Sequence, residues 1–242
     1  MKYYGNQNDF GALSAEDASF AKRAAEEALK EEKDRRREER ARKYTGTHTT
    51  MPIEDREMQK RWLKVAKEHD RDRVRGGVSW YMLVLLGFKT GLRIGDLCKL
   101  KVADVRGRER ISIVAQKTGK TTDIALQENA RKAIDAALKG RDGDDWVLES
   151  RQRNRSKGIR KPISRQRCYG IMKEIAEKTG FQEHVGCHTM RKTFAWNYYT
   201  TCGNINELQK VLNHSSQEAT IHYLGLDRKK IDRTIHDMPD DI

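Results

Sequence analysis

Six residues of types that can act on a phosphate group are spread over positions 93 to 223. They are Arg93, Lys117, His188, Arg191, His214 and Tyr223, with three positions from His188 to Arg191 and nine from His214 to Tyr223. Fixed guanidinium groups stabilise the extra negative charge of a five-coordinate phosphorus through charge-assisted, often bidentate, hydrogen bonds. A tyrosine hydroxyl, with an ordinary pKa of about 10, is a weak nucleophile until cations or a base favour its phenolate. Together these residue types suit attack on a phosphodiester without a metal ion.

Other catalytic motifs are incomplete or missing in the sequence. The Gly119-Lys120-Thr121 run resembles the end of a phosphate-binding P-loop, but that motif needs a glycine where this chain has Val114. There is no H-E-x-x-H motif, no G-x-S-x-G motif and no cluster of carboxylates, so metal-dependent nucleases and common hydrolases lack their residues. We therefore expect no cofactor and no metal, and we read the four cysteines as reduced thiols. The one conceivable zinc site has unsuitable ligand spacing: it would use His184, Cys187, His188 and Cys202.

The elements that must position the six residues are mostly helices. A helix is expected to start at Pro52, with Trp62 and Ala66 on its apolar face. The helix after it ends at Gly91, and a short helical pattern continues from Ile94. That helix before Gly91 covers residues 80–88. By apolar spacing, caps and glycine stops, the other predicted helices cover residues 128–138, 164–178, 189–201, 205–212 and 216–224.

The period of the apolar residues changes to two between Arg110 and Gln127. Ile111 and Ile113 alternate with their neighbours, and Ile124 follows a turn at Thr118-Gly119. This pattern predicts a β-hairpin with Lys117 near its tip. The fold class is therefore mainly α with a small antiparallel β-sheet, and we see no internal repeat.

The first 50 residues differ in composition from the rest. Residues 14–43 alternate acids and bases at spacings that stabilise a solvated helix, and residues 44–50 read as a linker. The apolar face of this charged N-terminal helix is rich in alanine and ends at Leu29, which favours a short docking contact over a long coiled coil. The predicted organisation is thus residues 1–50 as charged helix and linker, 51–226 as one folded domain and 227–242 as a tail.

Charge favours a polyanionic partner. Among 242 residues, 49 Lys and Arg stand against 36 Asp and Glu, a formal net charge of +13, which is typical of proteins that bind nucleic acid. Residues 1–50 contribute a net charge of only +1, so the basic excess belongs to the folded domain. Charge alone would also fit a basic surface that serves solubility. The longest apolar stretch, Val78 to Phe88, is shorter than the roughly 20 residues of a bilayer-spanning helix, and the polar N-terminus lacks a secretion signal.

The six residues and their surroundings resemble the tyrosine recombinase, or phage integrase, family. The motifs that carry the resemblance are Thr90-Gly91-Leu92-Arg93-Ile94-Gly95-Asp96-Leu97, the hairpin Lys117, His188-Thr189-Met190-Arg191, and Leu212-Asn213-His214-Ser215-Ser216 followed by Tyr223. Order, residue types and spacing all match, over about residues 51–226. The resemblance implies that family's catalytic-domain fold.

The resemblance also implies a role for each residue. Tyr223 would be the nucleophile that forms a 3′-phosphotyrosyl link, and Lys117 would be the general acid for the departing 5′ oxygen, with Lys120 as its competitor three positions on. Arg93 and Arg191 would stabilise the transition state, and Asp96 would hold Arg93 by pairing. His188 and His214 would orient the phosphate and assist proton transfer. Tyr198 and Tyr199 also lie in a helical stretch, and we expect them to serve packing.

The chain departs from the family pattern at three positions near the motifs. Asp96 replaces a glutamate, Asn213 replaces the glycine before the histidine, and Lys192 stands where a second histidine often follows the arginine. The N-terminus departs further, because residues 1–50 offer one charged helix in place of the usual core-binding domain. The departure leaves three possibilities for gripping DNA: a minimal clamp, a partner that supplies the rest, or a truncated relative.

The function implied is site-specific recombination, for integration or excision of a mobile element. The expected partners are double-stranded DNA, other copies of the chain in a tetramer on synapsed sites, with the tail 227–242 packing on a neighbour, and an accessory protein or DNA-bending factor. We expect a cytoplasmic protein, prokaryotic or phage-encoded, that acts on the chromosome. Two alternatives are a regulatory relative that binds DNA without cutting it and a relaxing enzyme like type IB topoisomerases.

Overall fold

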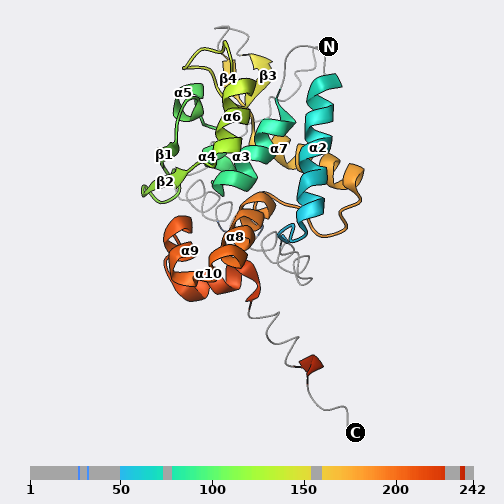
Figure 1. The fold of residues 1–242 in the computed structure, drawn as a ribbon, viewed down its shortest axis with the longest axis vertical. Coiled ribbons are helices and arrows are strands. Elements are labelled where there is room, and N and C mark those ends of the chain that lie inside the picture. Colours follow the sequence, from blue (N-terminus) through green and yellow to red (C-terminus); the bar gives the residue numbers. More distant parts are fainter. Residues whose placement is uncertain are drawn as a thin grey trace, which may run out of the picture. The chain divides into compact units, whose positions relative to one another are not determined.

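The computed structural model of the chain describes residues 50–72, 78–153, 160–226 and 235–237, together with Glu27 and Glu32, which are both helical. The chain divides into two compact units, Met1–His48 and Thr49–Ile242. The labelled elements in Figure 1 all belong to the second unit. In chain order they are α2 (Arg56–Asp72), α3 (Trp80–Thr90), α4 (Ile94–Leu97), α5 (Val102–Val105), β1 (Arg110–Val114), β2 (Thr121–Ala125), α6 (Glu128–Ala137), β3 (Glu149–Arg153), β4 (Arg160–Pro162), α7 (Arg165–Thr179), α8 (Thr189–Cys202), α9 (Ile205–Leu212) and α10 (Gln217–Leu224).

The larger hydrophobic core surrounds α3, whose residues are nearly all buried. Helices α2, α6 and α8 pack against α3, and α7 packs against α2. Trp62 of α2 is fully buried, with its ring 6.2 Å from that of Phe88 and 5.9 Å from that of Phe181, measured between centroids. The side chain of Ser79 caps the start of α3, and Gly91 ends it in a left-handed conformation with φ 59°. The segment that carries Arg93 therefore begins directly after a capped helix end.

The β1–β2 hairpin is an antiparallel pair with Ile111 opposite Ile124 and Ile113 opposite Thr122. Ile111 and Ile124 are buried in the larger core, whereas residues 116–121 around the turn are exposed. Strands β3 and β4 form a second antiparallel pair, separate from the first. The alternation of buried and exposed residues thus anchors the hairpin by one face and leaves the side chains at its tip exposed.

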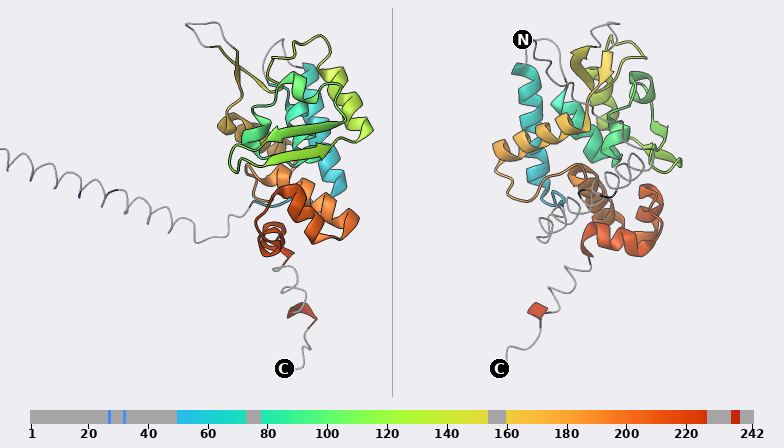
Figure 2. Two further views of the ribbon diagram at one scale, coloured as in Figure 1. Left: turned by 90° about the vertical axis from the view of Figure 1, so that its left-hand side faces the viewer. Right: turned by 180° about the vertical axis from the view of Figure 1, so that it is seen from behind.

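Helices α8, α9 and α10 lie together at one end of the unit (Figures 1 and 2). They enclose a second, smaller core. Helix α8 also packs against α3, and α9 packs against β2, so this end is joined to the rest through both a helix and the hairpin. The fully or nearly fully buried members of the smaller core are Ala195, Leu208, Leu212 and Leu224.

The predicted fold class is confirmed: the described residues form a mainly helical domain with small antiparallel sheets. The hairpin and its turn, and six helices from α3 to α10, lie where the sequence predicts them to within two residues. One boundary was wrong, because α2 begins at Arg56 and not at Pro52. The carboxylate of Asp55 accepts hydrogen bonds from the backbone N–H groups of Glu57 and Met58, so Asp55 caps the helix.

Some predictions fall on residues that the structure does not describe. They concern the charged helix at 14–43, the linker at 44–49 and the tail at 227–242, of which only Glu27, Glu32 and residues 235–237 are described. Three elements, α5, β3 and β4, have no counterpart among the elements predicted from the sequence. Their sequences, VADV, ESRQR and RKP, are too short or too polar to give a period.

Candidate active site

Arg191 is the buried centre of the candidate site. Only 5% of its side chain is exposed, although it carries a charge. Its Nη1 donates to the carbonyl oxygen of Gly91 at 2.6 Å and its Nη2 donates to the carbonyl oxygen of Leu212 at 2.6 Å. A guanidinium has five N–H groups, so these two bonds leave others for an anion. Burial lowers the pKa of Arg191 from its ordinary value, and the nearby charge of Tyr223, when ionised, acts in the opposite direction.

Tyr223 lies against both candidate histidines. Its hydroxyl is 3.4 Å from Nδ1 of His188, which comes 35 residues earlier. Its ring meets that of His214 edge to face, with centroids 5.0 Å apart, and that of His188 at 6.1 Å. Residues of the smaller core support the tyrosine from behind. The phenol of Tyr223 on α10 therefore lies close to two imidazoles, that of His188 at the start of α8 and that of His214 between α9 and α10.

The electrostatic surroundings of Tyr223 act in two directions. Burial raises the pKa of its phenol well above the ordinary value, while the positive charges of Arg191 and Arg93 lower it. Desolvation also lowers the pKa of His188, and the charges of Arg191, Lys192 and Lys117 lower it further. At neutral pH the free protein therefore holds a neutral phenol beside a neutral imidazole, a pair in which the imidazole can accept the phenol's proton.

The imidazole of His214 shares a hydrogen bond with a neighbouring threonine hydroxyl. Its Nδ1 lies 3.1 Å from Oγ1 of Thr220, and that hydroxyl donates to the carbonyl oxygen of Ser216 at 3.2 Å. In the arrangement in which this hydroxyl donates to Ser216, Nδ1 of His214 is the donor to the hydroxyl and Nε2 keeps its lone pair. Burial and the charges of Arg191 and Arg93 lower the pKa of His214 to about 4. His214 is thus neutral in the free protein and can donate from Nε2 only after taking up a proton.

Arg93 precedes α4 and is half-buried, with its charge close enough to affect His188, Arg191, His214 and Tyr223. Within the described part of the chain, its guanidinium has no hydrogen-bond acceptor and makes no ion pair. The expected pairing with Asp96 is therefore not seen there. The Asp96 carboxylate accepts a hydrogen bond of 3.1 Å from the backbone N–H of Gln116 instead. This bond ties the hairpin tip to the helix that follows Arg93.

Lys117 is exposed in the hairpin turn, and its charge acts on His188. The structure thus brings five of the six candidates into one electrostatic neighbourhood around Tyr223, and the charge of the exposed Lys117 reaches His188. Tyr198 and Tyr199 pack against the smaller core instead.

Lys192 and Asn213, which depart from the family pattern in the sequence, also belong to the site. Lys192 is 5% exposed, and its Nζ lies 5.1 Å from the centroid of the Tyr223 ring. Burial lowers the pKa of Lys192 from its ordinary value. Asn213 bonds through its side chain to β2. Each was already unusual in the sequence, but their contacts join segments more than 30 residues apart, and no local pattern reports such contacts.

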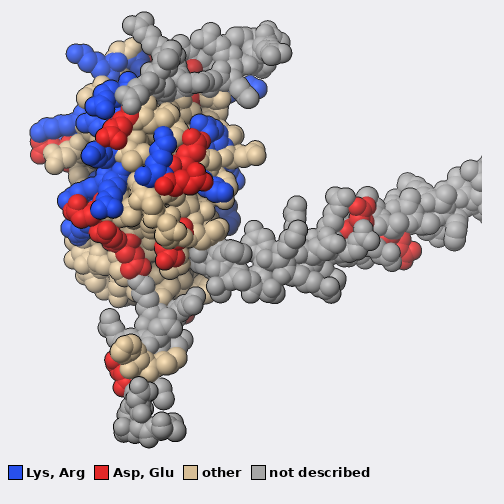
Figure 3. Space-filling model, turned by 90° about the vertical axis from the view of Figure 1, so that its right-hand side faces the viewer, with Lys and Arg blue, Asp and Glu red and all other residues tan. Residues whose placement is uncertain are grey.

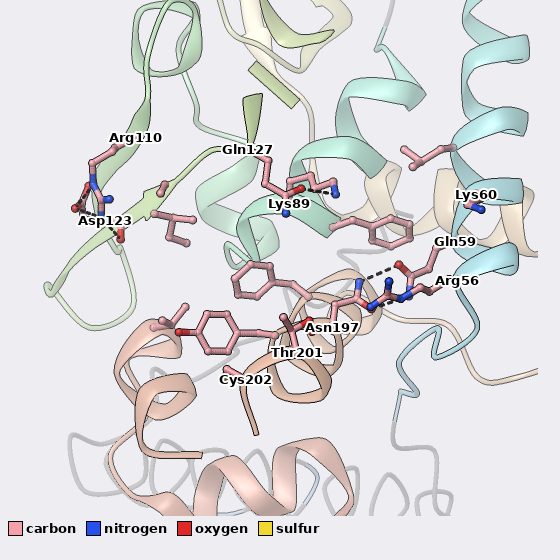
Figure 4. Close-up of a pocket in the computed structure, with 17 residues that line it drawn as sticks. Arg56, Gln59, Lys60, Lys89, Arg110, Asp123, Gln127, Asn197, Thr201 and Cys202 are labelled. Carbon is pink, nitrogen blue, oxygen red and sulfur yellow. Dashed lines mark hydrogen bonds and ion pairs between the residues drawn. The ribbon is translucent and has the colours of Figure 1, made fainter. Parts of the chain in front are cut away.

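A separate cavity of about 710 Å³ lies between α2, α3, α8 and β2 (Figure 4). None of the six candidates lines it. The paired amides of Gln59 and Asn197, which exchange two hydrogen bonds of 3.0 Å and 2.9 Å, lie at its wall and join α2 to α8. This cavity is therefore lined partly by α8 but is separate from the cluster of residues around Tyr223.

Neither a metal site nor a membrane span is found within the described ranges. In those ranges, no three His, Cys, Asp or Glu side chains are grouped so as to hold a metal ion. Likewise, no helix there is long and apolar enough to cross a membrane. On the face drawn in Figure 3, Lys and Arg side chains alternate with Asp and Glu, so the basic excess does not form one uniform patch on that face.

Known proteins match this chain over the region that carries the site. The sequence pattern of the phage integrase family matches residues 71–230. A probable integrase/recombinase of Bacillus subtilis, YoeC, is 35% identical over 147 residues, which are 61% of this chain and 77% of that protein. The tyrosine recombinase XerA of Pyrococcus furiosus is 28% identical over 191 residues, covering 77% of this chain and 62% of XerA. The chain thus spans less than two thirds of XerA.

Solved structures share the fold. A crystal structure of XerA recombinase matches with a TM-score of 0.57 and 24% identity, over 80% of this chain and 66% of that one. The XerH recombinase bound to its difH substrate, in a post-cleavage complex, matches with a TM-score of 0.57 and 16% identity, over 78% of this chain and 53% of that one. At these identities the likeness concerns the fold alone.

Proposed function

The chain belongs to the phage integrase family, and on that premise we propose that it is a site-specific DNA recombinase that cuts and rejoins strands through a 3′-phosphotyrosyl intermediate at Tyr223. The observation that carries the proposal is the position of the Tyr223 hydroxyl, 3.4 Å from Nδ1 of a neutral His188 and within the field of Arg93 and Arg191. A phenol needs both a proton acceptor and neighbouring cations to attack phosphorus.

Each step of the reaction has a residue to perform it. The Tyr223 oxygen bonds to phosphorus as its proton passes to Nδ1 of His188, and the bond from phosphorus to the 5′ oxygen breaks. Lys117 supplies the proton that the departing 5′ oxygen takes up. The second attack, by a 5′ hydroxyl of the partner strand, reverses these transfers and frees the tyrosine. Bond energy is conserved in the phosphotyrosine, so the reaction needs no ATP.

The two arginines bind the charge that develops between these steps. Arg191 is fixed by two carbonyl oxygens, so its guanidinium is oriented before DNA arrives, while among the described residues the guanidinium of Arg93 has no acceptor and is available to the phosphate. Such preorganised donors stabilise a transition state without reorganisation at the moment of reaction. His214, neutral in the free protein, would take up a proton as the phosphate binds and then donate from Nε2. The chain's own cations thereby take the place that a metal ion holds in other phosphoryl transfers.

The partners follow from the same proposal. Double-stranded DNA fits a net charge of +13, and the XerH neighbour is bound to its DNA substrate. We further propose a tetramer on two synapsed sites, in which the tail 227–242 packs on a neighbour, and an accessory or DNA-bending protein that supplements the grip of the catalytic domain. The setting proposed is the cytoplasm of a prokaryote, with the mobile element's DNA on the chromosome.

The proposal is tested with supercoiled plasmids that carry DNA from beside the gene, incubated with the full chain in EDTA. Recombinant products are expected, together with a protein–DNA adduct. Relaxed topoisomers without recombinants would favour the topoisomerase-like alternative. Binding in a gel-shift assay, with neither recombinants nor an adduct on intact or nicked DNA, would overturn the proposal in favour of a regulatory DNA-binding protein.

A further inference from the structure

Asn213 has an unusual backbone conformation at the end of α9. Its φ of 51° and ψ of 43° make it left-handed, the one non-glycine residue with positive φ among those described. Its backbone N–H caps the helix through the carbonyl oxygens of Gln209 and Lys210. Glycine adopts this conformation at no steric cost, and the cap needs no side chain. A role for the carboxamide would explain why this position holds asparagine.

The carboxamide of Asn213 bonds to the hairpin. Its Nδ2 donates to Oγ1 of Thr122 at 3.0 Å and to the carbonyl oxygen of Thr121 at 3.3 Å. These partners lie 91 and 92 residues earlier in the chain. Thr122 is 6% exposed, so water competes little for its hydroxyl. The contact is therefore a long-range tether between the end of α9 and strand β2.

The tether joins the two segments whose groups must act on one phosphate. Asn213 immediately precedes His214, and Thr121 follows the turn that carries Lys117. On the other side of the turn, the backbone N–H of Gln116 bonds to the Asp96 carboxylate. The hairpin is thus fixed at one point beside Arg93 and at another beside His214, with the exposed Lys117 between them.

We propose that Asn213 is a positioning residue that holds the hairpin, and with it the ammonium of Lys117, in register with His214 and Tyr223. The inference rests on the proposed function, because register matters only if the lysine protonates the leaving 5′ oxygen while the tyrosine attacks. It assigns a role to the carboxamide that a glycine in the same backbone conformation could not fill.

The test compares two nicked DNA substrates, one with the ordinary 5′ oxygen at the scissile bond and one with sulfur in its place. A thiolate leaves without a proton because its conjugate acid is far more acidic than an alcohol. A variant that misplaces the general acid therefore loses rate on the oxygen substrate and keeps it on the sulfur substrate. The measured quantity is the single-turnover rate of adduct formation by the full chain on each substrate.

For Asn213→Gly we expect a fall of about 10- to 100-fold on the oxygen substrate, since small misplacements of catalytic groups cost this much. On the sulfur substrate we expect a change of less than about threefold, because no proton is needed there. Lys117→Met should show the same pattern with a larger fall. Thr122→Val, which removes one of the two acceptors, should lie between Asn213→Gly and the wild type.

Asn204→Ala is the matched control. Asn204 caps the other end of α9 through its side chain, so its loss destabilises the same helix without touching the hairpin. We expect the ratio of the two rates to stay at the wild-type value in this control. Equal losses on both substrates in Asn213→Gly, or no loss on either, would overturn the positioning role.

A second measurement does not depend on catalysis. Hydrogen exchange at the backbone N–H groups of the hairpin should be faster in Asn213→Gly than in the wild type, and unchanged in Asn204→Ala. Unchanged exchange in Asn213→Gly would also overturn the tether. If the wild type forms no adduct on either substrate, the proposed function fails, while the exchange result still decides whether Asn213 holds the hairpin.

Discussion

Nη1 of Arg191 donates a hydrogen bond of 2.6 Å to the carbonyl oxygen of Gly91, 100 residues earlier in the chain. Through Nη2 the same guanidinium holds the carbonyl oxygen of Leu212. Gly91 lies two residues before Arg93, and Leu212 lies two residues before His214. The buried side chain of Arg191 therefore fixes the two segments that carry Arg93 and His214, and it also supplies a positive charge to the site.

Arg191→Lys should harm both folding and activity, because an ammonium cannot bond both carbonyl oxygens and still present a planar pair of donors. We expect the free energy of unfolding to fall by about 2 kcal/mol, the range for losing charged hydrogen bonds in a buried site. Adduct formation should fall by about 100-fold or more. Denaturant titration and single-turnover cleavage measure the two effects.

Arg167→Lys is the control for that substitution, since Arg167 is exposed and pairs with Glu174 on the same helix. Its effect should stay within about 0.5 kcal/mol. Wild-type stability and cleavage in Arg191→Lys would contradict the central role of the buried guanidinium.

Gly91→Ala should destabilise the protein more than Gly203→Ala. Both glycines end a helix with positive φ, 59° and 67° respectively. A Cβ at Gly91 would also overlap the ring of Phe194, whereas a Cβ at Gly203 meets no atom within 4 Å. We expect losses of about 3 and 1 kcal/mol in the free energy of unfolding, the difference being the cost of overpacking. Equal losses in thermal or denaturant unfolding would show that the Phe194 contact has no energetic weight.

The sequence predicts the elements well where one local signal decides. Gly91, Gly180 and Gly203 each end a helix in the left-handed conformation, and alternating isoleucines specify the hairpin. Strands β3 and β4 are rich in arginine and have no apolar period, so their pairing depends on tertiary context that local propensity does not contain.

Some features of the candidate site could likewise be predicted from the sequence, and others could not. The spacing of His188, Arg191, His214 and Tyr223 could be read from the sequence through a family resemblance. The burial of Arg191 and Lys192 could not, because such side chains are usually exposed. The tether from Asn213 to β2 spans 91 residues or more, and Asp96 proved to bond to the hairpin backbone where a pairing with Arg93 was expected.

The free energy of unfolding should fall as the pH is lowered from 7 toward 4, and His214 should contribute to the fall. Its pKa is about 4 in the folded protein and near 6.5 when unfolded, so between these values the unfolded state binds more protons and gains stability as the pH falls. For a half-buried group screened by solvent we expect at most about 2 kcal/mol. His214→Asn should flatten the pH dependence of the free energy of unfolding in denaturant titrations at several pH values.

His222→Asn, a change at an exposed position on α10, is the control. An unchanged pH dependence in His214→Asn would refute the assignment of this effect to His214.

Lys192→Met should stabilise the protein and weaken its activity. The lysine is 5% exposed, burial lowers its pKa, and no hydrogen-bond acceptor for its Nζ lies among the described residues. Methionine fills a similar volume without a buried charge, so the free energy of unfolding at pH 7 should rise by about 1 kcal/mol. Cleavage should fall by about tenfold, because a cation beside Tyr223 and His188 is lost.

Lys173→Met is the matched control for Lys192→Met. Lys173 also lies over a tyrosine ring, that of Tyr169 at 5.8 Å, but it is exposed and lies on α7, which carries none of the six candidates. It should change neither stability beyond about 0.5 kcal/mol nor cleavage. A fall in the free energy of unfolding in Lys192→Met would contradict this prediction and show that Lys192 stabilises the fold.

Attack of Tyr223 on DNA is tested most directly by mass spectrometry of the peptide that stays linked to DNA after a denaturing gel. Wild-type protein with nicked substrate should give one adduct, on the peptide containing Tyr223. Tyr223→Phe should give none while binding DNA with unchanged affinity and unfolding at the same denaturant concentration. Tyr199→Phe, a change on α8 outside the cluster, should form the adduct normally. An adduct on another residue, or one that persists in Tyr223→Phe, would contradict the assignment of Tyr223 as the nucleophile.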